Sequence, residues 1–279
     1  MIQAPRRAPA QPRPLSIREF KGVDMTGSRD LRRAEEMVNM ILDDDGTPEM
    51  RPGYEDLFTT SLGPGPILGL HRWTQPDGSR IRIVHHGTKL YKGQPLLNLV
   101  EIYSGMSGTE VSTSFELGTK LCIVDGTKFV VFDGVTAVDG ETIAYVPTRY
   151  IGRAPAGGGT LVEDFNLLQP KWKEYFTTVA STTTYQLSDT AIDSVTSVKL
   201  NGVALTNPAG YTVNLATGLV TLAANPGNPP AGTTNNLEII PSKVRSGYAD
   251  RIKKCNISAV YGGPSDSRVF LTGNPDYPH

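Results

Sequence analysis

The sequence predicts an all-β fold: blade-like antiparallel sheets, interrupted by a small antiparallel β-sandwich. Three observations support this fold class. Glycine (29) and proline (21) are frequent among the 279 residues, which indicates many turns. Short apolar runs of strand length alternate with Gly-containing turns along most of the chain. The composition changes at about residue 156 and changes back at about residue 246, as expected for an inserted domain.

Composition limits the protein classes. With 38% hydrophobic residues the chain can bury a core, and its net charge of −1 does not indicate a nucleic-acid-binding protein. Cys122 and Cys255 lie too far apart in sequence for a zinc motif or a disulfide framework, so we expect synthesis in a reducing compartment. The apolar runs are too short and broken for a membrane-spanning helix, and no signal core is visible.

Residues 1–33 read as an extended basic arm. They contain eight Lys or Arg residues and three acids, whereas residues 34–56 contain eight acids and one Arg. Prolines at positions 5, 9, 12 and 14 keep such a segment extended and reduce the entropy lost on docking. Two interpretations stay open: a solvated arm beside an acidic surface, or an arm that docks on an acidic neighbour such as a second copy of the chain.

The stretch "NMILDDDGTPEMRPGY", residues 39–54, predicts a β-hairpin. Alternating apolar residues flank Asp43–Asp45 and Gly46, and Asp-Gly between two such runs is a strong hairpin signal. The three acids are consecutive, so they do not match the alternate spacing of a calcium loop, and we expect no metal here. A short helix capped by Ser28 is expected just before the hairpin.

Further strands follow within residues 34–155. "ILGLHRWTQ" and "SRIRIVHHG" flank "PDG" and predict a second hairpin, followed by a strand at 88–93. "KLCIVDGTKFVVFDG" predicts a third hairpin around Asp125-Gly126, and "ETIAYVPT" another strand, ended by Pro147.

A faint internal repeat connects these strands. "GTKLYKG" (87–93), "GTKFVVFDG" (126–134) and "SRVFLTGNP" (267–275) resemble versions of one motif, and the first two lie about 40 residues apart. That period suits a four-stranded propeller blade. Two or three such units do not close a propeller, so the blades are expected to be incomplete.

Residues 156–245 are predicted to be a linker and an inserted sandwich. "GRAPAGGGT" (152–160) reads as a Gly/Pro-rich linker, and the following Thr- and Asn-rich strands are joined by tight turns at Asn201-Gly202 and Thr217-Gly218. "QPKWKEYF" is expected to be a boundary strand of this insert, although Lys171 and Lys173 around Trp172 superficially resemble a nucleic-acid surface. Residues 246–279 are predicted to continue the propeller-like domain.

The hairpin segment resembles a known family. "NMILDDDGTPEMRPGYEDL" is similar to the N-terminal signature of tail hub, nozzle or stabilisation proteins of tailed bacteriophages, and "SGYADRIKKCNISAVYGGPSDSRVFLTGNPDYP" resembles a later blade of the same proteins. The insert resembles β-sandwich modules of phage tail and fibre proteins. The resemblance implies a β-propeller protein with a structural role in the virion.

Enzyme chemistry has weaker candidates. His71, His85 and His86 fall on predicted strands, and neighbours on a strand point to opposite faces, so His85 and His86 are not expected to chelate one metal. The three acids Asp133, Asp139 and Glu141 are candidates for glycoside cleavage or are solvated turn residues. Trp73 and Trp172 either line a sugar-binding groove or anchor a core or an interface.

We therefore expect a structural tail protein and not an enzyme, without metal or cofactor, that forms a ring around the DNA exit channel. The expected partners are further copies of the chain (six-fold in a nozzle), adjoining tail or portal and adaptor proteins, and DNA only as cargo, with no membrane. Arg51, Pro52, Gly53 and Tyr54 are predicted structural or interface residues: a rigid turn, an ion pair from Arg51 and packing of Tyr54. The expected location is the virion, after synthesis in the bacterial cytoplasm. The alternatives are a head-to-tail adaptor or fibre-attachment protein, and a carbohydrate-binding or glycan-cleaving receptor protein.

Overall fold

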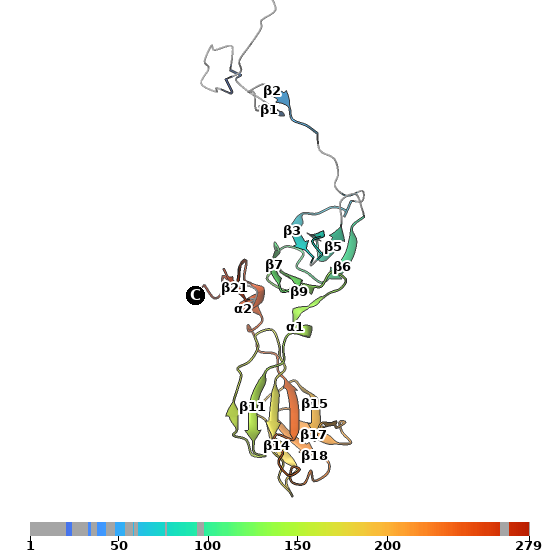
Figure 1. Ribbon diagram of the computed structural model, residues 1–279, viewed down its shortest axis with the longest axis vertical. Helices are drawn as coiled ribbons and strands as arrows, with labels where there is room; N and C mark the ends of the chain where they lie inside the picture. The colour runs from blue at the N-terminus through green and yellow to red at the C-terminus, as the bar shows by residue number, and fades with distance from the viewer. Residues whose placement is uncertain are drawn as a thin grey trace, which may run out of the picture. The chain divides into compact units, whose positions relative to one another are not determined.

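A computed structural model describes residues 21–23, 33–34, 38–42, 48–53, 58, 61–75, 77–93, 98–262 and 268–278 (Figure 1). The structure is mostly β, with 45% strand and 4% helix in several antiparallel sheets, which confirms the all-β prediction. The chain divides into two compact units, residues 1–57 and 58–279, each of which is described by itself.

The first unit contains the predicted hairpin. Strands β1 (Met40–Leu42) and β2 (Pro48–Met50) pair antiparallel, with Met40 opposite Met50. The turn residues 43–47 and most of the segment predicted as a helix lie outside the described residues.

The second unit begins with two four-stranded antiparallel sheets, each formed by strands consecutive in sequence. The first sheet contains β3 (Ile67–Thr74), β4 (Arg80–His86), β5 (Lys89–Gly93) and β6 (Val100–Ser104). The middle sheet contains β7 (Thr113–Leu117), β8 (Lys120–Val124), β9 (Phe129–Phe132) and β10 (Ala137–Asp139). The hairpins predicted around Asp77-Gly78 and Asp125-Gly126 are confirmed.

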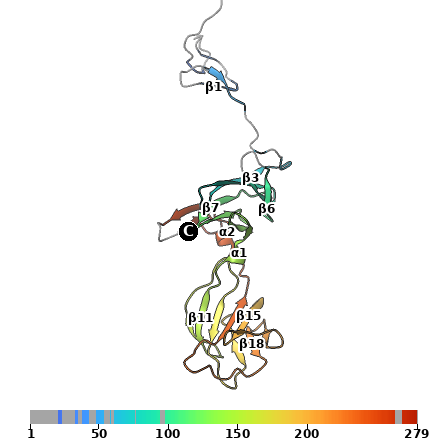
Figure 2. The same ribbon diagram turned by 45° about the vertical axis from the view of Figure 1, so that its right-hand side comes forward.

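A C-terminal hairpin forms a third layer. Helix α2 (Asp250–Lys253) leads into β20 (Ile257–Tyr261), which pairs antiparallel with β21 (Arg268–Thr272). Figure 2 shows this hairpin beside β7 of the middle sheet. The repeated motif occupies the third strand, β5 or β9, in both four-stranded sheets. The described residues contain no closed propeller.

The layers pack face to face because the middle sheet is apolar on both faces. Leu121 and Ile123 of β8 face the first sheet, where they share a core with Trp73 and Ile83. The intervening Cys122 and Val124 face the C-terminal hairpin. A strand covered on both sides needs apolar residues at every position, which explains the unbroken runs "LCIV" and "FVVF".

The insert is built from two further sheets. The larger has the order β12-β11-β13-β19-β15-β16 and the smaller the order β14-β18-β17. Their bounds are β11 Thr148–Arg153, β12 Thr160–Leu161, β13 Lys173–Phe176, β14 Thr184–Gln186, β15 Ser194–Leu200, β16 Val203–Ala204, β17 Tyr211–Asn214, β18 Leu219–Leu222 and β19 Leu237–Ser242. Side chains from both sheets, including Phe176 and Val220, form one core.

Three local predictions about the insert and its entry were wrong. The predicted strand "ETIAYVPT" begins as one helical turn, α1 (Gly140–Ile143), and Gly140 packs so closely on Phe129 that a Cβ atom would lie 2.2 Å from its ring. The Gly/Pro-rich stretch after Arg153 is the loop of the antiparallel hairpin β11–β12, not a linker. The insert is not purely antiparallel, because β11 and β13 are parallel; the chain crosses over between them through β12 and a long loop.

Candidate assembly surfaces and polar sites

The signature residues predicted as structural lie directly after β2. Arg51, Pro52 and Gly53 are exposed, and the Arg51 N–H donates to the Asn39 carbonyl over 2.8 Å, which extends the β1–β2 hairpin by one contact. Tyr54 lies outside the described residues. The rigid turn, the ion pair of Arg51 and the packing of Tyr54 stay predictions.

The outer face of the C-terminal hairpin is an exposed surface with an apolar centre, which we call the open face: Ile257, Ala259, Tyr261 and Phe270. Arg268 and Thr272, opposite Tyr261 and Ile257, lie at the two ends of this face. The side chains of Ile257, Tyr261 and Phe270 are 57%, 63% and 57% exposed. Cross-strand pairing places Ala259 opposite Phe270, and the Tyr261 and Phe270 rings meet edge to face at 5.9 Å between centroids. Burying these apolar side chains against another surface would be more favourable than leaving them in water.

The opposite face of the same hairpin is covered along β21, whereas Ser258 and Val260 of β20 on that face are exposed. Val269 and Leu271 alternate with Phe270 along β21 and pack against the core of Phe115, Cys122 and Val131. Each layer of the stack therefore has an apolar face toward the next, and among the described residues the third layer ends with such a face exposed.

The first sheet forms the other end of the stack. Its outer face carries Leu70, which is 76% exposed, together with Arg72 and Arg82 directly opposite each other on β3 and β4. Lys89 and Glu101 form an exposed ion pair of 2.7 Å on β5 and β6. This face is more polar than the open face, but it also has an exposed apolar side chain, Leu70, on its edge strand β3.

A buried histidine–serine chain joins the first and middle sheets. His85 Nε2 lies 2.9 Å and 3.0 Å from the carbonyl oxygens of Gly87 and Ser107, so this nitrogen must carry the proton. Neutral His85 Nδ1 then accepts from the Ser112 hydroxyl at 3.0 Å, and Ser112 Oγ accepts from His71 Nε2 at 2.9 Å. His71 Nδ1 is left to accept from Ser114 at 2.9 Å.

The hydrogen bonds of the histidine–serine chain require that both imidazoles, of His71 and His85, are neutral. Burial, followed by the nearby His85, lowers the pKa of His71 to about 4. Burial also lowers the pKa of His85, against the hydrogen bonds to Ser107 and Gly87, which raise it. Gly69 is required beside the chain, because a Cβ there would lie 2.2 Å from Ser112 Oγ. The arrangement ties two sheets together and has no open position for a substrate.

His86, the third histidine singled out in the sequence, points to the other face of β4. It is buried and packs near Gly65, where an added Cβ would lie 3.3 Å from its Nε2. The sequence prediction that His85 and His86 face opposite sides is confirmed. In the described ranges no group of three or more His, Cys, Asp or Glu residues is arranged to hold a metal ion.

The acids and tryptophans considered for glycan chemistry do not converge. Asp133 accepts from the backbone N–H groups of Val135 and Thr136 in a turn, Asp139 binds Tyr103 and Lys128, and Glu141 pairs with Lys253. Trp73 and Trp172 are both buried core residues, in the stacked sheets and in the insert respectively. Neither tryptophan lines a groove, so the structure favours the core interpretation for both.

The base of the insert is held by a buried charge network. Glu174 is fully buried and accepts from Trp172 Nε1 at 2.7 Å and from the Ser188 N–H at 3.1 Å, while Arg153 Nε lies 3.1 Å from its second oxygen. Nearby, the guanidinium groups of Arg149 and Arg245 stack on the Phe165 ring, at 3.7 Å and 3.4 Å from its centroid. A buried carboxylate with several donors fixes the orientation of the strands that carry them.

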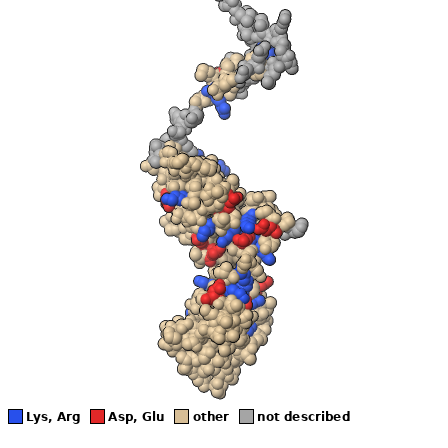
Figure 3. Space-filling model, turned by 180° about the vertical axis from the view of Figure 1, so that it is seen from behind, with Lys and Arg blue, Asp and Glu red and all other residues tan. Residues whose placement is uncertain are grey.

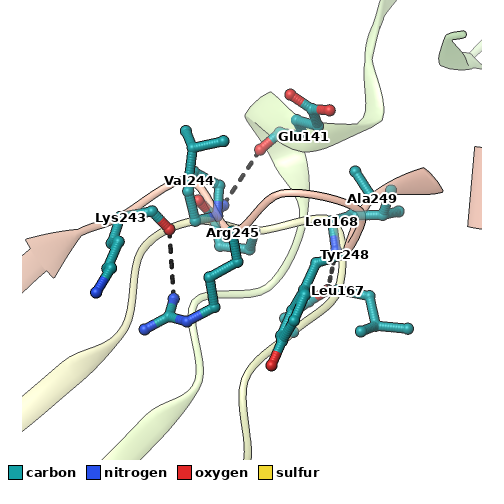
Figure 4. A pocket seen from close by; sticks show the side chains of 11 residues that line it. Glu141, Leu167, Leu168, Lys243, Val244, Arg245, Tyr248 and Ala249 are labelled. Carbon is teal, nitrogen blue, oxygen red and sulfur yellow. Dashed lines mark hydrogen bonds between the residues drawn. The ribbon is translucent and has the colours of Figure 1, made fainter. Parts of the chain in front are cut away.

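A small pocket lies where the insert meets the stacked sheets (Figure 4). Its volume is about 50 Å³, which is room for water but not for a substrate. The dashed lines in Figure 4 include the bond from the Gln169 amide to the Glu141 carbonyl and the bond from Arg245 to the Lys243 carbonyl. The pocket therefore marks the junction between the insert and the stacked sheets.

Comparison with known proteins gives no relative: no family model, curated protein or solved structure matches this chain. In the part of the chain that the structure describes, no helix is long and apolar enough to cross a membrane.

The open face and the histidine–serine chain were not predicted from the sequence. The open face could have been predicted from the sequence, because "ISAVY" and "RVFLT" carry apolar residues at both odd and even positions. Such a strand predicts cover on both sides. The histidine–serine chain had no comparable signal, since it joins side chains that lie up to 43 residues apart.

Proposed function

We propose that this chain is a structural protein of a phage tail, which assembles head to tail into a ring around the DNA exit channel. The observation that carries the proposal is the open face of Ile257, Ala259, Tyr261 and Phe270 at one end of a stack of sheets. The similarity of "NMILDDDGTPEMRPGY" to tail hub and nozzle proteins supplies the class of assembly.

The stacking pattern suggests how subunits meet. The three layers correspond to propeller-like blades, of which the third has two strands. In the proposed contact, the first sheet of one subunit covers the open face of its neighbour, with Leu70 against Tyr261 and Phe270. These are different surfaces of the same chain, so the contact is heterologous, and repeated heterologous contacts form a ring when the rotation closes.

The remaining features fit this role. The Arg- and Pro-rich arm and the inserted two-sheet domain are the segments proposed to contact adjoining tail proteins. A net charge of −1 suits a conduit, because a strongly basic lumen would retain DNA through its phosphates. A nozzle would be six-fold, and DNA would pass through it as cargo.

Complementation between two variants tests the contact. Phe270→Asp and Leu70→Asp each place a charge on one of the two proposed surfaces. We expect the wild-type chain to form rings, alone or with its neighbouring virion proteins, and each variant to stay monomeric in multi-angle light scattering. Because each variant keeps one intact surface, an equimolar mixture should form heterodimers and nothing larger.

Val135→Asp is the matched control, since Val135 is 81% exposed on the turn between β9 and β10 and belongs to neither surface. It should assemble like the wild type. A wild-type chain that stays monomeric even with its neighbours would overturn the proposal, and so would Phe270→Asp assembling normally.

A further inference from the structure

One end of the insert lacks charged side chains. Residues 177–188 and 200–236 contain no Lys, Arg, Asp or Glu, and Thr, Asn, Gly and Pro dominate there. Figure 3 shows this as an uncoloured surface at the far end of the insert, in contrast to the mixed charges nearer the stacked sheets. A solvent-facing surface without charge selects against charged ligands, because it offers them no opposite charge.

A hollow of about 530 Å³ lies at the edge of this surface. This volume is within the usual range for small-molecule sites. Its lining comes from the outer face of the larger sheet and the loop before β19: Tyr175, Lys199, Asn201, Gly202, Pro230, Thr233, Thr234, Asn235, Asn236 and Glu238.

The floor is a row of three side chains across adjacent strands. Tyr175 on β13 and Lys199 on β15 lie directly opposite Glu238 on β19, on its two sides. The Tyr175 hydroxyl donates to Glu238 at 2.7 Å, and Lys199 Nζ lies 3.3 Å from the other carboxylate oxygen. The two charges cancel, so the floor is polar but has no net charge.

The protonation states of Tyr175 and Glu238 are fixed at neutral pH. Burial, followed by Glu238, raises the pKa of Tyr175 to about 12, so its hydroxyl stays a donor. Burial alone would raise the pKa of Glu238, but the hydrogen bonds from Tyr175 and Lys199 outweigh it, and the pKa is lowered. Beside the half-buried ring of Tyr175, Glu238 therefore has its Oε1 buried and its Oε2 as the oxygen that accepts from Tyr175.

Two amides on the rim are oriented by hydrogen bonds, one from a backbone N–H and one from a side-chain amide. Asn235 accepts from the Gly152 N–H at 2.6 Å, and Asn201 accepts from the Asn236 amide at 3.1 Å, each through its side-chain oxygen. Within the described residues, neither amide nitrogen of Asn201 or Asn235 has a hydrogen-bond partner, and the Thr234 hydroxyl has none either. The rim thus presents donors that are held in place and unused.

We propose that this hollow binds a neutral saccharide. Vicinal hydroxyl groups both donate and accept, so they match amide and hydroxyl donors above a carboxylate acceptor. The Tyr175 ring offers an apolar surface to the C–H face of a sugar ring. The absence of net charge favours a neutral glycan over an acidic one. This inference is independent of the ring, since it concerns the insert alone.

A glycan array that spans neutral and acidic oligosaccharides tests the proposal with the full-length chain. We expect the chain to retain neutral glycans. Thr234→Trp fills the hollow at an exposed position without removing a hydrogen bond of the fold, and it should weaken that binding at least about tenfold. Tyr175→Phe removes only the hydroxyl and should weaken binding less.

Thr212→Trp is the matched control, because Thr212 is exposed on β17 in the other sheet and does not line the hollow. It should bind like the wild type. Retention of acidic glycans only, binding of no glycan, or full binding by Thr234→Trp would each overturn the proposal. None of these outcomes bears on ring formation, which is measured by mass.

Discussion

The middle sheet and the C-terminal hairpin follow the same strand pattern but differ in their cover. In β9, Phe129 and Val131 face the hairpin and Val130 and Phe132 face the first sheet, and all four side chains are buried. In β20 every residue is exposed, although four of its five residues, all but Ser258, are apolar. The comparison shows that residue type alone does not decide burial here; the position of a strand in the stack does. It also identifies where a fourth layer would add.

The largest expected effect separates these two layers. Phe132 is fully buried and meets Trp73 edge to face at 5.5 Å, so Phe132→Ala should lower the free energy of unfolding by about 3–5 kcal/mol. Phe270→Ala removes the same atoms from an exposed site and should change it by no more than about 0.5 kcal/mol. Urea titration followed by tryptophan fluorescence, at a concentration where both variants are monomeric, measures the difference.

Hydrogen exchange localises the effect, because only Phe132→Ala should lower the protection of amides in β8 and β9. Equal losses of stability in the two variants would mean that the open face is covered within a single chain, contrary to the comparison.

How far the sequence predicts this arrangement depends on the range of the interactions. The hairpins around Asp77-Gly78 and Asp125-Gly126 were predictable because turn chemistry and alternation are local. The unbroken run "FVVF" also carried the information that β9 is covered on both faces. The parallel pairing of β11 with β13 was not predictable, because it depends on how a long crossover returns to the sheet.

The candidate sites divide in the same way. The open face is local in sequence and could have been read from β20 and β21. The hollow of the insert could not be predicted from the sequence, because its floor joins Tyr175, Lys199 and Glu238 from three strands far apart in the chain. Trp73 and Trp172 show the same limit: the sequence left a sugar-binding groove and a core or interface anchor open for both, and only the packing of distant strands decides for the core.

A second prediction concerns the histidine–serine chain. This chain lies between the first and middle sheets and not between the middle sheet and the C-terminal hairpin. His71 has a pKa of about 4 in the fold against about 6.5 when unfolded, so the folded state prefers the neutral form. Its contribution to stability is complete above pH 6.5 and is lost as the pH falls from 6.5 toward 4. Between pH 8 and pH 5 this amounts to about 2 kcal/mol of unfolding free energy.

His71→Gln keeps hydrogen-bonding groups beside Ser112 and Ser114 but does not titrate. Urea titrations at a series of pH values should therefore show a flatter pH dependence for this variant than for the wild type, by about 2 kcal/mol between pH 8 and pH 5. An unchanged slope would show that His71 is protonated in the fold without cost, and that the histidine–serine chain does not hold these sheets together.

The smallest effect tests whether polar contacts add to the apolar packing between these two sheets. The Tyr103 hydroxyl on β6 donates to Asp139 on β10 at 2.8 Å and so joins the edge strands of the first and middle sheets. Tyr103→Phe should lower the free energy of unfolding by about 1 kcal/mol, the usual net value of such a bond. Tyr91→Phe is the matched control, because Tyr91 lies on the outer face of β5 and its hydroxyl has no partner in the described residues. If both variants unfold at the same urea concentration, the hydrogen bond between Tyr103 and Asp139 adds nothing measurable to the packing of the two sheets.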